Sequence, residues 1–181
     1  MREVVAEERA ELGLGPTDLF DPYQLANAHG VRVYTLTDLR NWGVGEAAHG
    51  HFTGANSATW SAALIPLGAG RIIVENDGHA EVRRRASIAH EMGHYLLEHE
   101  FDVAYVGDAH ERLFDKSKEK QADFMAGELL IPEAAARKAA FAGWDNSQVS
   151  IAYGVSTQFA QNQMKGARVI ATRTAKKYGR G

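Results

Sequence analysis

One stretch, residues 86–98 with the sequence ASIAHEMGHYLLE, constrains this chain more than any other. It contains His90, Glu91 and His94 in the spacing H-E-x-x-H. On an α-helix, residues four apart are rotated by only about 40° around the axis and lie one turn apart. His90 and His94 would therefore aim two imidazoles at one point, as a divalent metal requires. Glu91 is turned by about 100° from His90, the place of the general base in zinc peptidases.

The spacing of apolar residues predicts that this stretch is a buried helix. One stripe follows the i, i+4, i+7, i+11, i+14 pattern of a core-facing helix, and its members are Val82, Ala86, Ala89, Gly93 and Leu96. A second apolar flank consists of Ile88, Met92 and Tyr95. We expect the helix to start at 76–78, where an Asx side chain can cap free amides. Because glycine costs about 1 kcal/mol in a helix, Gly93 indicates that another backbone approaches closely there.

A third metal ligand is expected from a second helix, predicted over 118–130. Glu119 and Asp123 lie four residues apart in it and so share one face. Two histidines leave a site short of one protein ligand, and a glutamate supplies it in the His₂Glu zinc class. Asp123 can accept the free N–H of a metal-bound histidine and thereby fix its tautomer. Glu128 is a reserve ligand.

Two plainer interpretations stay open. A chain with 8 histidines can show H-E-x-x-H by accident, with both histidines solvated on the surface. Glu119 can equally lie on a solvated helix face among its basic neighbours Lys116, Lys118 and Lys120. The two patterns together favour the metal site, because the first supplies two histidine ligands and the second supplies the carboxylate that would complete them.

Composition excludes several other classes of protein. With 181 residues, 45% of them hydrophobic, the chain can build one globular core. Without cysteine, any zinc must be held by histidines and carboxylates. A net charge of −3 gives no basic field for nucleic acid or a membrane surface. We see no signal peptide and no transmembrane run, so we expect a soluble cytoplasmic protein.

The rest of the chain predicts a mixed α and β architecture. Before the motif we expect two helices and three strands, with residues 37–57 irregular: helices at 4–12 and 22–30, and strands at 31–36, 58–67 and 71–75. After it we expect a surface loop and then a series of helices, with a frayed basic tail from residue 172: the loop at 100–116 and the helices at 118–130, 132–140, 147–153 and 156–170.

Two runs carry a resemblance to a known family. RRRASIAHEMGHYLLEHE at 83–100 follows the pattern R-x-R-x-x-I-A-H-E-x-G-H, and EKQADFMAGELLIP at 119–132 follows E-x-x-A-(N/D)-x-x-A-x-x-L-L-x-P. Together with DPYQLANAHGVRVY at 21–34, they make residues 20–165 resemble the ImmA/IrrE family of metallopeptidases. Phe124-Met125 departs from the usual polar residue followed by Phe.

This resemblance implies a fold, a site and a domain division. The fold is α+β: a small zincin-like domain with a short antiparallel or mixed three-stranded sheet packed on the H-E-x-x-H helix, plus C-terminal helices. The site binds one Zn²⁺ through His90, His94 and Glu119, with Glu91 as the base and Asp123 behind the ligands. Residues 1–143 form the gluzincin-like peptidase domain, and 144–181 form a reduced helix-turn-helix-like extension with a basic tail.

The resemblance also implies a substrate, since family members cut helix-turn-helix repressors of stress responses or mobile elements. The alternative is a non-proteolytic regulator that holds a partner repressor or DNA and uses zinc structurally. For 148–164, a plain pair of packing helices is the favoured interpretation over a reduced helix-turn-helix. Few basic residues lie there, so strong nucleic-acid binding is not expected. The donor that would stabilise the oxyanion is left open among Tyr105, His110 and Tyr153, and the loop histidines His49 and His51 are weaker candidates for the cleft.

Overall fold

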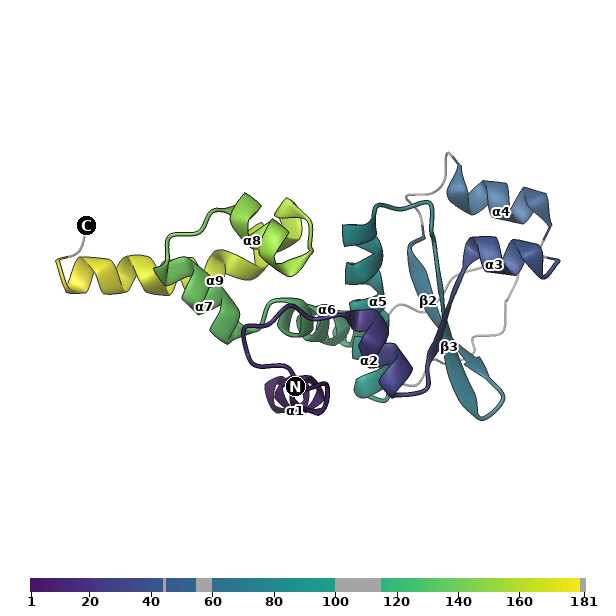
Figure 1. Ribbon diagram of the computed structural model, residues 1–181, viewed down its shortest axis with the longest axis horizontal. Helices are drawn as coiled ribbons and strands as arrows, with labels where there is room; N and C mark the ends of the chain where they lie inside the picture. Colours follow the sequence, from purple (N-terminus) through teal and green to yellow (C-terminus); the bar gives the residue numbers. More distant parts are fainter. Residues whose placement is uncertain (44, 55–59, 100–114, 180–181) are drawn as a thin grey trace.

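The computed structural model describes residues 1–43, 45–54, 60–99 and 115–179. A helix pair, α5 and α6, lies at the centre, with a small sheet on one side and the C-terminal helices on the other (Figure 1). In chain order the elements are α1 (Arg2–Glu11), α2 (Pro22–Ala28), β1 (Arg32–Thr35), α3 (Leu36–Asn41), α4 (Glu46–Thr53), β2 (Ala62–Leu67), β3 (Gly70–Glu75), α5 (Glu81–Leu96), α6 (Lys116–Leu130), α7 (Glu133–Phe141), α8 (Asn146–Tyr153) and α9 (Thr157–Lys177).

The sheet is three-stranded and mixed, in the order β1-β3-β2. β3 runs parallel to β1, with Arg32 opposite Ile72, and antiparallel to β2, with Leu64 opposite Ile73. The hairpin between β2 and β3 turns at Gly68, whose φ of 59° is one that glycine adopts without strain. The predicted α+β class with a mixed sheet is confirmed, and β2 is left at an edge of the sheet.

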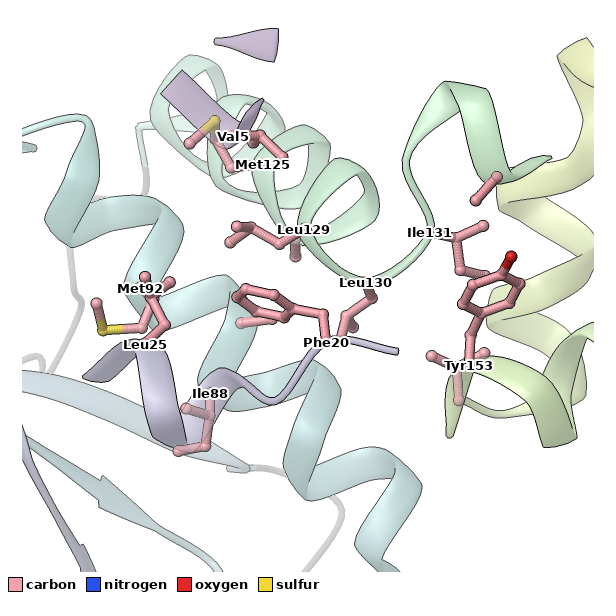
Figure 2. Packing of buried hydrophobic residues seen from close by; sticks show 14 of the residues in the cluster. Val5, Phe20, Leu25, Ile88, Met92, Met125, Leu129, Leu130, Ile131 and Tyr153 are labelled. Atoms are coloured by element: carbon pink, nitrogen blue, oxygen red, sulfur yellow. The ribbon is translucent and has the colours of Figure 1, made fainter. Parts of the chain in front are cut away.

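One buried cluster joins the sheet, the central helices and the C-terminal helices. In Figure 2 it passes from Ile88 and Met92 of α5 through Phe20 and Leu130 to Tyr153 of α8. The predicted inward residues Ile88, Ala89 and Met92 are completely buried. Because the cluster contains residues from both sides of position 143, it ties the C-terminal helices to the rest of the core; the division at 143/144 stays a prediction.

The start of α5 differs from the prediction. The helix begins at Glu81 after Ala80, with no side-chain cap, and residues 76–78 lie outside it. Asn76 is completely buried, and its amide nitrogen donates to the carbonyls of Phe52 (2.7 Å) and Trp60 (3.2 Å). A buried amide must find partners, and here these are the end of α4 and the segment before β2 rather than the start of α5. The expected Asx cap was therefore wrong.

A charged network fixes the first turn of α5 to the end of β3. Arg84 binds the buried Glu75 carboxylate through two nitrogens, and the Tyr23 hydroxyl donates to Glu75 Oε2 at 2.8 Å. Burial raises the pKa of Tyr23, and the adjoining Glu75 carboxylate raises it further. Side chains of α2 and α5 thus both bind one carboxylate at the end of β3. These bonds fix the orientation of α5 relative to the sheet.

Two further expectations were wrong, and one cannot be judged. The region 37–57, expected to be irregular, contains α3 and α4; α3 starts with a capping box between Thr35 and Asp38. The tail expected to fray from residue 172 continues as helix to Lys177. The loop predicted at 100–116 lies almost wholly outside the described residues.

In the described part of the chain, no helix combines the length and hydrophobicity needed to cross a bilayer.

Gly93 lies where the backbones of α5 and α6 approach closely. A Cβ atom at this position would be 3.0 Å from the carbonyl oxygen of Ala122 and 3.2 Å from its Cα. Both atoms belong to the backbone of α6, which cannot move aside as a flexible side chain would. The close approach inferred from the sequence is therefore confirmed.

Substituting Gly93 tests this packing. Helix propensity favours Gly93→Ala by about 1 kcal/mol, but overpacking costs about 1–3 kcal/mol. We expect a net loss of up to about 2 kcal/mol in the free energy of unfolding, measured by urea denaturation. Gly166→Ala on α9 is the matched control, because nothing lies within 4 Å of its would-be Cβ. It should gain up to about 1 kcal/mol; an equal gain for Gly93→Ala would contradict the close approach.

The half-buried phenol of Tyr23 predicts how stability changes in alkali. An unfolded tyrosine ionises near pH 10, whereas Tyr23 in the folded protein keeps its proton to higher pH because its pKa is raised. Its contribution to stability is complete below about pH 10 and is lost as the pH rises through the folded pKa. We expect Tyr23→Phe to reduce the steepness of this alkaline loss, measured as the urea midpoint from pH 8 to 11. Identical slopes would contradict the assignment.

Candidate metal centre

The two histidines of α5 converge as their spacing predicts. Their Nε2 atoms lie 3.1 Å apart, with the rings edge to face at 4.8 Å between centroids. His94 is buried and His90 is partly exposed. The interpretation of both as solvated surface residues is thereby excluded.

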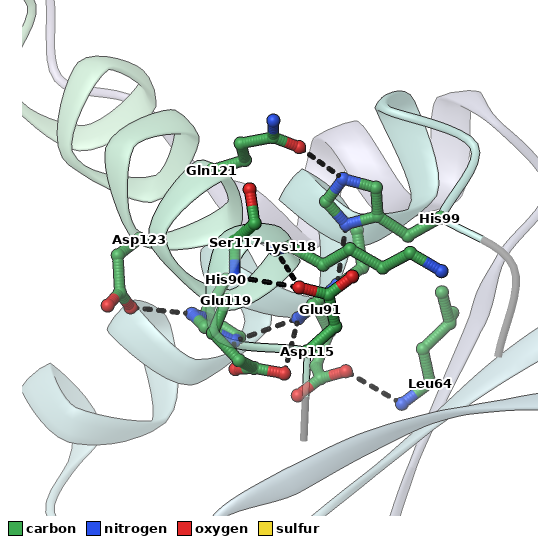
Figure 3. A network of polar contacts seen from close by, with 11 residues as sticks. Leu64, His90, Glu91, His99, Asp115, Ser117, Lys118, Glu119, Gln121 and Asp123 are labelled. Carbon is green, nitrogen blue, oxygen red and sulfur yellow. Dashed lines mark hydrogen bonds and ion pairs between the residues drawn. The ribbon is translucent and has the colours of Figure 1, made fainter. Parts of the chain in front are cut away.

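Glu119 of α6 completes a triangle with the two rings. Its Oε2 lies 3.2 Å from His90 Nε2, and its Oε1 lies 3.5 Å from His94 Nε2 (Figure 3). Glu119 sits in the first turn of α6, where Asp115 caps the helix by accepting from the amides of Ser117 and Lys118. These two amides hold the pKa of Asp115 below its usual value, so the cap stays charged near neutral pH and fixes the turn that carries Glu119.

The three ligand atoms fit the dimensions of a zinc site. Zinc binds nitrogen and oxygen at about 2.0–2.1 Å in a tetrahedron, which separates ligand atoms by about 3.3–3.4 Å. The observed separations of 3.1, 3.2 and 3.5 Å bracket this value. Among the described residues, His90, His94 and Glu119 are the group that can hold a metal ion. Three protein ligands leave a tetrahedral ion one further position, which is typical of catalytic sites.

Asp123 fixes the tautomer of His90, as expected from the sequence. Its Oδ1 lies 2.9 Å from His90 Nδ1. A carboxylate can only accept, so Nδ1 carries the proton and Nε2 keeps its lone pair toward Glu119 and His94. Asp123 itself is largely exposed.

His99 does the same for His94, and the sequence did not predict it. Its Nδ1 lies 2.9 Å from His94 Nδ1, and its Nε2 lies 2.9 Å from Gln121 Oε1 (Figure 3). Because Gln121 Oε1 only accepts, His99 carries its proton on Nε2 and accepts at Nδ1 from His94. His94 is then protonated at Nδ1 and presents an unprotonated Nε2 to a metal.

The expectation that His99 lies on a frayed helix end was wrong. α5 ends in a Schellman motif: His99 N donates to His94 O, and Glu98 N donates to Tyr95 O, each at 3.0 Å. Glu98 takes the left-handed conformation, φ 51°, that glycine usually provides. This reversal turns the chain back so that His99 is buried beside His94. With Glu in place of Gly, the motif leaves no sequence signal.

Glu91 is held by a backbone amide of the sheet. Its side chain is 8% exposed, and its Oε2 accepts from the backbone N–H of Leu64 at 2.8 Å (Figure 3). Leu64 lies on the edge strand β2. The bond orients the carboxylate within the same cleft as the three ligands.

The cleft has a volume of about 760 Å³. Four elements contribute to it: α5, α6, α9 and the segment entering β2. The cleft is large enough for several residues of an extended chain. The proposed ligands and Glu91 are part of its lining and are accessible through it.

The other sequence candidates lie elsewhere. Glu128 is buried, ion-paired with Arg2 at 3.3 Å, and accepts from the Glu133 amide, so it supports the helix ends instead of the site. Tyr153 is 5% exposed within the core and does not line the cleft. Tyr105 and His110 lie outside the described residues. His49 and His51 lie on α4, and neither lines the cleft.

The comparisons with known proteins agree with this geometry. The model of one protein family, described as the IrrE N-terminal-like domain (Peptidase_M78), matches residues 26–165, more than half of the chain. The match begins within α2 and ends within α9, so it includes every residue of the site. No curated protein matches the chain.

Removing His99 should weaken metal binding without unfolding the protein. Loss of such a partner behind a metal-binding histidine typically costs 10–100-fold in affinity, and we expect this range for His99→Ala. The measurement is a Zn²⁺ titration in competition with a fluorescent chelator, with circular dichroism to verify folding. His29→Ala is the matched control: this histidine is bonded to Glu8, away from the cleft, and should leave affinity unchanged. Affinity within twofold of wild type for His99→Ala would refute the role.

Proposed function

The chain belongs to the M78 peptidase family, the IrrE N-terminal-like group, and from this membership we propose that it is a zinc-dependent endopeptidase with one ion per chain. His90, His94 and Glu119 are the proposed ligands, Glu91 the catalytic base, and Asp123 and His99 their positioning residues. The observation that carries the proposal is the convergence of three ligand atoms beside Glu91 in one open cleft.

The chemistry follows from what each side chain offers. When bound, Zn²⁺ supplies Lewis acidity, which lowers the pKa of a water molecule and polarises a peptide carbonyl. Glu91 accepts the proton of the attacking water and later delivers it to the leaving amine. The Leu64 N–H donates to Glu91 Oε2, which holds the carboxylate in place in the same cleft as the proposed ligands.

Two observations favour an enzyme over the alternative, a regulator that binds a repressor or DNA with a structural zinc. Structural sites are closed by four protein ligands, whereas the group found in the described residues has three. A structural site also has no use for Glu91, whose buried carboxylate lines the cleft beside the ligands.

The proposed substrate is a helix-turn-helix transcriptional repressor, cut in the cytoplasm to relieve repression in a stress response or of a mobile element. This part comes from the resemblance to the ImmA/IrrE family. The net charge of −3 agrees with a protein substrate, because it offers no general attraction to nucleic acid.

Replacing the base separates catalysis from metal binding. We expect Glu91→Gln to reduce cleavage by about 10²–10⁴-fold, the usual contribution of a general base, with Zn²⁺ affinity retained. The measurement is co-expression with helix-turn-helix repressors encoded near its gene, with mass spectrometry of the fragments.

Glu119→Gln is the paired variant for this experiment, since it should lose cleavage together with metal affinity. If a repressor is cut by wild type and by Glu91→Gln at equal rates, Glu91 is not the base. If wild type binds zinc and represses or derepresses without any cut, the non-proteolytic alternative is correct.

A further inference from the structure

The first turns of α9 face the proposed catalytic cleft. Phe159, Asn162 and Gln163 line the same cleft as His90 and Glu91, although they lie some seventy residues further along the chain. Their i, i+3, i+4 spacing places them on one face of the helix. α8 and α9 are joined by a short turn with Gly154 in the left-handed conformation, the layout of a reduced helix-turn-helix. In a DNA-binding helix-turn-helix, the first turns of the second helix contact base edges. The corresponding turns of α9 face the cleft.

This wall is fixed to the helix that carries Glu119. Gln163 Nε2 donates to the carbonyl of Ile131 at 3.1 Å. A Cβ atom at Gly127 would lie 2.6 Å from Gln163 Oε1, so the glutamine side chain lies directly on the α6 backbone. Gly127 is one turn beyond Asp123 on the same helix face. Gln163 thus links α9 to α6, while the body of α9 packs on α7 and α8.

In the described part of the chain, the lining of the cleft continues from the proposed ligands along α5 toward its first turn. On α5, from its end toward its start, the cleft is lined by His94, His90, Ser87 and Arg83. At 1.5 Å per residue, the seven residues from His90 to Arg83 span about 11 Å, the length of about three residues of extended chain at 3.3 Å each. About three residues on one side of a scissile bond can thus lie between the ligands and the far end.

The lining indicates what would bind there. Small residues that allow a chain to lie close are part of the lining: Ala62, Ala86 and Ala126. Phe159 is partly exposed and backed by the buried core, so it offers a firm apolar surface. Asn162 is exposed beside it. At the far end Arg83 donates to Ser61 Oγ at 2.8 Å.

We propose that Phe159 and Asn162 are specificity-determining residues, which form a subsite for an apolar side chain of the substrate within about three residues of the cut. This inference rests on the proposed endopeptidase activity. The substrate segment lies extended along α5, with its apolar side chain on the ring of Phe159 and Asn162 at the rim. The C-terminal helices then select the substrate rather than bind DNA.

The test is a cleavage-site profile of the zinc-loaded full chain on a peptide library made by digesting a bacterial proteome. Mass spectrometry of the new ends gives the residue preference at each position around the cut. We expect wild type to favour apolar residues at one position within three of the cut. Phe159→Ala should reduce that preference by about 10-fold, within the range for a lost apolar contact. Asn162→Glu, at an exposed position, should introduce a preference for Lys or Arg there.

Ile151→Ala is the control, because Ile151 is 81% exposed on α8 and does not line the cleft. It should reproduce the wild-type profile.

Unchanged profiles for both Phe159→Ala and Asn162→Glu, with cleavage intact, would overturn the inference and leave the proposed function standing. If wild type with bound zinc cuts no peptide at all, the proposed function fails and the inference falls with it. A general loss of rate without any change in preference would assign α9 a structural role only and also overturn the inference.

Discussion

The close packing of α5 on α6 is the interaction on which the rest of this structure depends. Gly93, between the two histidines, lets the backbone of α6 at Ala122 approach to a distance that a side chain would prevent. That approach brings the Glu119 carboxylate, from a separate segment of chain, within 3.2–3.5 Å of both rings. Without it, α5 would present two imidazoles with no carboxylate beside them.

Each functional side chain is oriented by a partner from a different part of the fold. Asp123 of α6 sets the tautomer of His90, and the Gln121–His99 pair sets that of His94. The edge strand β2 holds Glu91 through the amide of Leu64. Such partners keep ligands in the geometry that a metal requires. The sheet, though small, therefore acts directly on the site.

The C-terminal helices share one core with the central pair and also form one wall of the cleft. The link is physical: Gln163 lies on the bare backbone at Gly127, one turn from Asp123. If the proposed peptidase activity is correct, such a wall allows α9 to contribute to substrate choice without altering the chemistry at the proposed ligands.

The sequence by itself determined those parts of the site that helix geometry makes local. Spacings of four residues placed His90 with His94 and Glu119 with Asp123, and a glycine inside a helix indicated a close neighbour. Tertiary structure decided the rest. His99 reaches His94 only because the chain reverses at Glu98 in a left-handed conformation that glutamate does not signal. The start of α5, the Leu64 amide and the α9 wall depend on contacts between distant segments, and no periodicity in one segment specifies where another will lie.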